Sequence, residues 1–93
     1  MKEKEKRVVS IFEALGSPIR YKMIKLLADG EMCTSKLAEA LGKDKSTVSK
    51  HLKILKDLDI VRFVTKEKYV YYRLKKSDIL KLLEFAEKIF GRE

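Results

Sequence analysis

Apolar residues recur along most of this chain at intervals of three and four, the spacing that places them on one face of an α-helix. The pattern predicts helices over about residues 5–15, 18–28, 34–41, 45–57 and 77–90. It is interrupted at about residues 60–74, where β-branched and aromatic residues alternate with polar ones around a lysine-rich centre. We expect two strands there, joined as a hairpin.

The third and fourth predicted helices are separated by a short turn at Gly42. A residue without a Cβ takes the left-handed conformation that ends a helix at little cost. Asp44 can cap the following helix, because its carboxylate accepts hydrogen bonds from first-turn amides. Two helices around a glycine turn, the second polar and basic on its open side, are typical of a DNA-reading helix-turn-helix. We therefore expect a mainly α fold with a small β-wing, a winged helix-turn-helix.

Composition limits the classes of protein to which the chain can belong. Its 93 residues fit one domain, 1–93, since no Pro-, Gly- or Ser-rich linker divides them. The apolar content of 45% argues against a disordered chain, and no apolar run approaches the ~20 residues of a membrane span. The charged stretch from Lys2 to Arg7 lacks the apolar core of a secretory signal, and the single cysteine cannot form an internal disulfide. We expect a cytoplasmic protein with no membrane partner.

The net charge of +8 is concentrated in one part of the chain. Residues 42–76 contain eleven basic and four acidic side chains, whereas the rest of the chain has a surplus of only one positive charge. Such a concentration costs self-repulsion, and it is what neutralising several phosphates requires. A solvated lysine-rich surface is the alternative interpretation. Confinement of the surplus to the fourth helix and the hairpin favours contact with nucleic acid.

Ten side chains of this basic region are candidates for contact with double-stranded DNA. Six project from the fourth helix away from its apolar stripe: Lys45, Ser46, Thr47, Ser49, Lys50 and Lys53. His51 either bonds a phosphate or packs beneath that helix. Lys66, Lys68 and Arg73 are the candidates on the hairpin. Because the helix has no Arg, Asn or Gln for bidentate base contacts, we expect phosphate positioning and DNA shape to supply much of the specificity.

The last predicted helix has more apolar residues than one small core can absorb. They either pack on the body of the same chain or form a two-fold homodimer interface with the first helix alongside, and we favour the homodimer. The expected interface residues are Phe12, Leu80, Leu83, Phe85, Ala86, Ile89 and Phe90.

No constellation of side chains supports catalysis or a bound cofactor. The sequence has no phosphate-binding glycine loop, and its one cysteine has no second thiol, His or acid at a motif spacing. We therefore expect neither an enzyme nor a cofactor.

Several segments, in this order and spacing, resemble the ArsR/SmtB winged-helix repressors. They include residues 14–20 (ALGSPIR), 46–55 (STVSKHLKIL) and 70–74 (VYYRL). The resemblance implies a homodimeric prokaryotic repressor that binds a palindromic operator and is released by an effector. It also implies that the helix over 45–57 enters the major groove, that the wing touches the DNA backbone and that the terminal helices dimerise. The alternative is a winged-helix module that docks on RNA or on an acidic protein within a larger assembly.

The metal sites of that family are not matched here. Its thiol site has the form Glu-Leu-Cys-Val-Cys-Asp-Leu, whereas residues 31–37 of this chain keep Cys33 but place Ser35 and Lys36 at the second thiol and the acid. The last helix has no His for the family's other site. Soft metals need three or four thiolate or imidazole ligands, so we expect no metal site. A packed side chain, a redox-responsive thiol and a lone ligand remain the interpretations of Cys33.

Overall fold

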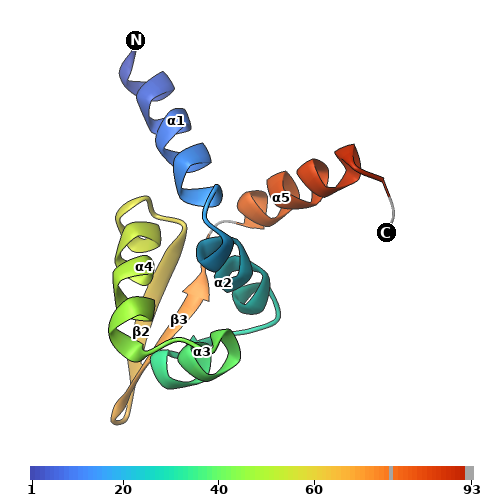
Figure 1. Cartoon of the computed structure of the whole chain (residues 1–93). Helices are drawn as coiled ribbons and strands as arrows, with labels where there is room; N and C mark the ends of the chain where they lie inside the picture. The colour runs from blue at the N-terminus through green and yellow to red at the C-terminus, as the bar shows by residue number, and fades with distance from the viewer. Residues whose placement is uncertain (76, 92–93) are drawn as a thin grey trace.

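The computed structural model describes residues 1–75 and 77–91. Within that part of the chain, helices are interspersed with short strands as shown in Figure 1. In chain order, the elements are α1 (Glu3–Leu15), α2 (Pro18–Ala28), β1 (Met32–Cys33), α3 (Thr34–Leu41), α4 (Lys45–Asp57), β2 (Val61–Lys66), β3 (Tyr69–Leu74) and α5 (Ser77–Ile89). Helix α1 begins before the predicted residue 5, and α5 ends one residue before the predicted 90.

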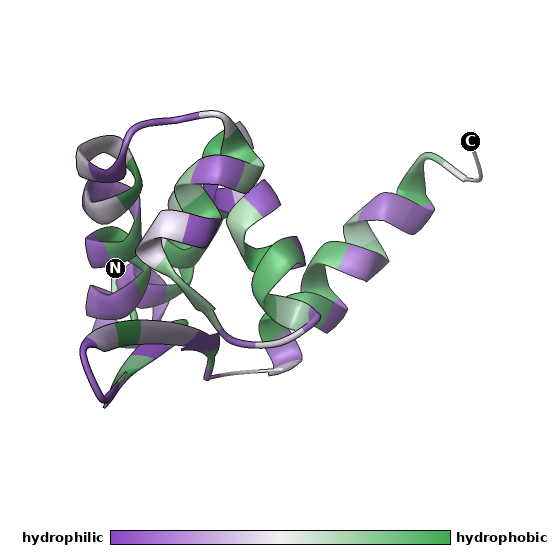
Figure 2. Ribbon diagram, turned by 90° about the horizontal axis from the view of Figure 1, so that it is seen from below, coloured by the Kyte–Doolittle hydropathy of each residue, from purple (hydrophilic) through white to green (hydrophobic). Residues whose placement is uncertain are grey.

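The core lies where α2, α3 and α4 meet the base of the sheet. Each helix contributes the residues of its apolar stripe, so that the interior contains only hydrophobic side chains among the residues described. The buried set is Ala14, Met23, Ile24, Leu27, Leu37, Ala38, Val48, Leu52, Leu55, Ile60, Val61, Ile79 and Leu83. Figure 2 shows these apolar segments facing one another while hydrophilic segments lie outside. Burial of this kind is the main favourable term in folding a small domain.

The sheet has three antiparallel strands in the order β1-β3-β2. Strands β2 and β3 form the predicted hairpin, with Lys66 paired to Tyr69, so the turn consists of Glu67 and Lys68 alone. Glu67 has a φ of 55°, the positive value that two-residue hairpin turns require. Together β2, β3 and their turn form the wing. Strand β1 pairs its two residues with Tyr72 and Tyr71, which ties the start of α3 to the sheet.

Helices α1 and α5 extend from the body as two separate arms (Figure 1). Only Ala14 of α1 and Ile79 and Leu83 of α5 belong to the buried core. Consequently most of α1 and the second half of α5 have one side without a partner in the protomer. None of the helices in the described ranges is long and apolar enough to cross a bilayer.

Candidate nucleic-acid interface

Helix α4 is placed by a turn whose features follow from the local sequence. Gly42 has the left-handed φ and ψ of 64° and 35°, and the Lys43 amide donates to the Ala38 carbonyl at 3.0 Å, closing the end of α3. Asp44 then caps α4 by accepting from the Thr47 amide at 2.8 Å. Hydrogen bonds from Thr47 and Ser46 hold the pKa of the Asp44 carboxyl below its usual value. The predicted glycine turn and Asp44 cap are both confirmed.

One side of α4 is buried and the other is polar. Val48, Leu52 and Leu55 are buried in the core. Of the predicted contact residues on this helix, Lys45, Ser46, Ser49, Lys50 and Lys53 are exposed, whereas Thr47 and His51 are half-buried. The Ser46 hydroxyl donates to Asp44 at 3.3 Å and so also supports the cap. The exposed side is thus a row of lysines and hydroxyls with its backbone fixed by the core.

The lysines of α4 differ in their present partners. Lys53 pairs with Asp57 one turn later at 2.8 Å, and both side chains are largely exposed. An exposed pair of this kind contributes little and opens readily. Lys45 and Lys50 have no hydrogen bond or ion pair with any residue that the structure describes. Lys50 has only a longer-range electrostatic interaction with Asp44, so its ammonium group is open to an anionic partner.

His51 contacts a residue that lies outside the predicted set, Arg20 of α2. The Arg20 Nη1 is 2.9 Å from the His51 Nδ1, and its Nε donates to the Ala14 carbonyl at 2.8 Å. Burial lowers the pKa of His51, and the nearby guanidinium lowers it further. Arg20 and His51 are 31 residues apart, so no local pattern could have joined them.

The basic residues of the wing differ in whether they are already paired within the protomer. Lys66, expected to reach for DNA, is instead paired with Glu31 and lies over the Tyr71 ring at 5.6 Å from its centroid. Lys68, in the turn, is exposed. Arg73 is exposed on β3 directly opposite Arg62 of β2. The structure therefore leaves Lys68 and Arg73 open to solvent, while Lys66 would have to leave Glu31 to bind a phosphate.

The predicted interface residues fall into two groups in the protomer. Leu83 is only 5% exposed and belongs to the core, and Leu80 is half-buried. These two residues pack on their own chain, in contrast to the expectation, because the first half of α5 lies against the body. The remaining interface candidates are exposed: Phe12, Phe85, Ala86, Ile89 and Phe90. Phe12, Ala86 and Phe90 also line an apolar groove of about 370 Å³ between α1 and α5.

The second half of α5 is held to the body by a polar cluster on α2. The Tyr21 hydroxyl donates to Glu87, and the Lys25 Nζ lies 3.1 Å from the same carboxylate. These hydrogen bonds lower the pKa of Glu87 below its usual value and raise the pKa of both Tyr21 and Lys25. We call these three residues the Glu87 clamp. It connects the second half of α5 to α2.

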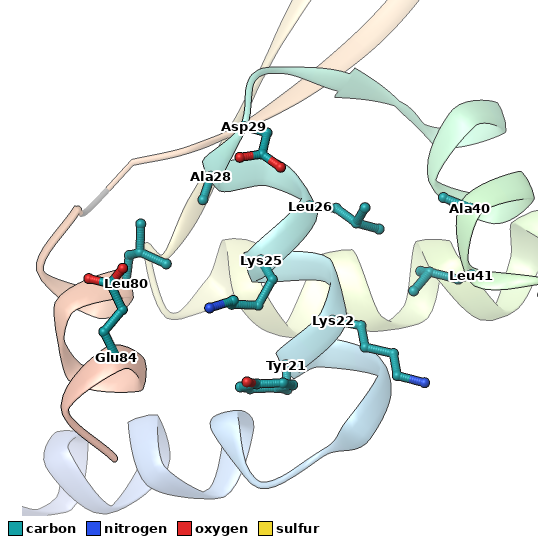
Figure 3. Close-up of a pocket in the computed structure, with 10 residues that line it drawn as sticks. All are labelled: Tyr21, Lys22, Lys25, Leu26, Ala28, Asp29, Ala40, Leu41, Leu80 and Glu84. Atoms are coloured by element: carbon teal, nitrogen blue, oxygen red, sulfur yellow. The ribbon is translucent and has the colours of Figure 1, made fainter. Parts of the chain in front are cut away.

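A second groove, of about 490 Å³, lies over α2 between α3 and α5 (Figure 3). Its apolar lining includes Leu26, Leu41 and Leu80, and the Lys25 side chain extends across it toward α5. The charged lining residues are balanced in sign: Lys22, Lys25, Asp29 and Glu84. Leu80 lines this groove together with residues of α2, in agreement with its half-burial.

Cys33 lies at the end of β1, opposite Tyr71, and is half-buried. Among the residues described, no three His, Cys, Asp or Glu side chains lie close enough together to hold a metal ion. Since metal capture between two protomers would involve residues of both, the expected lack of a metal site stays a prediction.

Comparison with known proteins places these features in a family. Residues 17–62 match the model for "Bacterial regulatory protein, arsR family". An uncharacterized HTH-type transcriptional regulator of Methanocaldococcus jannaschii is 32% identical over 94% of this chain and 99% of its own length. The transcriptional repressor SdpR of Bacillus subtilis is 34% identical over 70% of this chain and 72% of its own.

The fold is shared with solved structures as well. One is the solution NMR structure of a homodimeric winged helix-turn-helix DNA-binding domain from Mycobacterium bovis, a possible ArsR-family transcriptional regulator. It is 25% identical with a TM-score of 0.83, and the match covers 96% of this chain and 86% of that one. The arrangement of α3, α4 and the wing is therefore that of a winged helix-turn-helix.

Proposed function

This chain belongs to the ArsR family of bacterial regulatory proteins, and from that premise we propose that it is a homodimeric repressor that binds a palindromic operator through α4. The relatives named above are a regulator and a repressor, which supports DNA binding as the activity. We further propose that the protein acts in the cytoplasm, where prokaryotic DNA lies, and that it catalyses no reaction.

The observation that carries the proposal is the division of α4 into an apolar and a polar side. Its apolar side is filled by the protomer's own core, so the polar side remains for a partner. That side presents Lys45, Lys50 and Lys53 beside the hydroxyls of Ser46 and Ser49. Lysines neutralise phosphates, and hydroxyls donate to phosphates or base edges. The surplus of seven positive charges over residues 42–76 extends this chemistry to the wing, where we propose contacts from Lys68, Arg73 and a released Lys66.

We propose that the two arms α1 and α5 form the dimer interface. Phe85, Ile89 and Phe90 are between 72% and 80% exposed in the protomer, which is unfavourable for side chains of this size. A second copy that covers them would also fill the groove between α1 and α5. Two recognition helices in such a dimer can be set about one DNA turn apart, roughly 34–36 Å.

We propose that this repressor lacks the thiolate metal site of some relatives, because Ser35 and Lys36 stand where that site has a thiol and an acid. Cys33 remains the one candidate for a redox response. Its half-buried position beside Tyr71 gives an oxidant partial access.

The proposal is tested by selecting bound fragments from a random pool of duplex DNA and footprinting the recovered site. A protected palindrome is expected. Equal binding to all duplexes, or a preference for RNA, would contradict a repressor and favour an interaction module.

The residues are tested by Lys50→Ala and Lys53→Ala, with Lys22→Ala of α2 as a matched exposed-lysine control. Each α4 variant should weaken operator binding and flatten its dependence on salt. The expected change in the log–log slope is about 0.9 for each lost phosphate contact, so about twice that in a dimer. The Lys22 variant should bind as the wild type does. Unchanged affinity in both α4 variants would contradict this placement of the DNA.

A further inference from the structure

Arg20 joins three helices through polar contacts. Its amide donates to the Ser17 cap at 3.3 Å, its Nε donates to the Ala14 carbonyl at the end of α1, and its Nη1 lies 2.9 Å from His51 Nδ1 on α4. The guanidinium is partly buried between these elements. The bond to the Ala14 carbonyl therefore holds the guanidinium in place beside the histidine.

This contact determines where the histidine proton lies. A guanidinium has five N–H donors and no acceptor. His51 Nδ1 must therefore accept, which means that it carries no proton, and a neutral imidazole then has its single proton on Nε2. A charged imidazole would direct an N–H at another N–H and place a second positive charge beside the guanidinium. The lowered pKa of His51 agrees with the neutral form.

The Nε2–H group has no partner within the part of the chain that the structure describes. Every fully buried polar side-chain atom there does have a partner. Nε2 is consequently accessible to solvent, although the ring as a whole is half-buried. His51 is the residue next to Lys50 and lies one turn after Thr47, at the border between the buried and polar sides of α4.

We propose that Arg20 is a positioning residue that holds His51 in the Nε2–H tautomer, and that this N–H donates to a phosphate oxygen of the operator beside α4. The inference rests on the proposed function for its DNA ligand, but the tautomer is a property of the free protein. The contact differs in kind from those of the lysines. A neutral donor adds affinity without neutralising a phosphate, so it leaves the salt dependence unchanged.

The tautomer is tested first, in the free protein at neutral pH. His51 is the only histidine, so long-range ¹H–¹⁵N spectra of uniformly ¹⁵N-labelled protein report on it alone. We expect an unprotonated Nδ1 and a protonated Nε2. Arg20→Lys keeps the positive charge but loses the fork that holds both Ala14 and His51, so it should give a mixture of tautomers. A proton on Nδ1, or a charged ring, in the wild type would overturn the proposal whatever the DNA does.

The phosphate contact is tested with two substitutions of His51 and the operator recovered by selection. His51→Asn keeps an acceptor for Arg20 but cannot reach the position of Nε2, so affinity should fall on the order of tenfold per protomer. His51→Gln places an amide donor near that position and should recover part of the loss. In both variants the slope against salt should stay at the wild-type value.

The outcomes separate this inference from the proposed function. Wild-type affinity in His51→Asn, together with weakened Lys50→Ala, would overturn the phosphate contact and leave the operator-binding role of α4 standing. A flattened salt slope in His51→Asn would overturn the neutral donor. If neither the His51 nor the lysine substitutions changed operator affinity, the result would contradict the proposed function itself.

Discussion

Helices α4 and α5 are both thirteen residues long and both amphipathic, yet the protomer buries their apolar sides to different extents. In α4 the apolar stripe is buried along its length by the protomer's core. In α5 only the first half is covered, at Ile79 and Leu83, and the aromatic residues near its end are exposed. Under the proposed function, α4 would meet DNA with its polar side chains and α5 would meet a second copy with its apolar ones. The protein thus has a polar, basic surface on α4, which suits a charged partner, and an apolar surface on α5, which suits a second copy of itself.

The largest expected effect comes from placing a charge on the apolar side of α5. Ile89→Asp puts a carboxylate where we propose that a second copy packs, and Ile89 touches little of its own chain, being 78% exposed. The variant should stay folded but sediment as a monomer. Its operator affinity should fall by at least about 100-fold, because the two half-sites are no longer linked.

Leu83→Asp provides the contrast on the same helix. Leu83 is buried in the protomer, so a carboxylate there should reduce the stability of the fold itself, as measured by thermal unfolding. A folded, dimeric Ile89→Asp protein would place the interface elsewhere. A fully stable Leu83→Asp protein would contradict the division of α5 into a packed and a free half.

A smaller effect is expected at the turn that directs α4. Gly42→Ala forces a side chain into a left-handed conformation, although no atom lies within 4 Å of the new Cβ. The cost is therefore one of backbone conformation, about 1–2 kcal/mol in the free energy of unfolding. Gly16→Ala is the matched control, because Gly16 has a φ of −75° and its Cβ would meet only ordinary contacts. Denaturant unfolding that shows equal stability for the two variants would contradict this assignment.

The smallest effect is expected from the Glu87 clamp, since the Lys25 and Glu87 side chains are about 40% exposed. Glu87→Gln should slightly lower stability at neutral pH relative to Glu84→Gln, which removes the same charge from a neighbouring position. The pKa of Glu87 is depressed in the folded protein, so its contribution is present above the ordinary value of 4.5 and is lost as the pH falls through the folded value.

Unfolding midpoints in urea, measured at neutral pH and again in acid, check this prediction. The gap between wild type and Glu87→Gln should close in acid. A gap that widens as the pH falls would mean that the charged clamp does not stabilise the protomer.

Local features of the sequence predicted most of the helix-turn-helix half of the molecule. The Gly42 turn, the Asp44 cap and the apolar stripe of α4 depend on residues within a few positions of one another, and all three are present. The wing was also predictable, because its alternation of residues is local. Contacts between distant residues were not predictable. Arg20 with His51 and Lys66 with Glu31 each join elements far apart in the chain.

The sequence by itself determined the elements, the order in which they follow and the region where positive charge collects, because periodicity, capping and composition act over short distances. Only the tertiary structure decided which apolar residues of α5 the protomer covers, which of the wing lysines is engaged and which ring nitrogen of His51 is free. Those outcomes depend on how elements distant in the chain pack against one another. That packing involves many residues at once, which no single stretch of sequence contains.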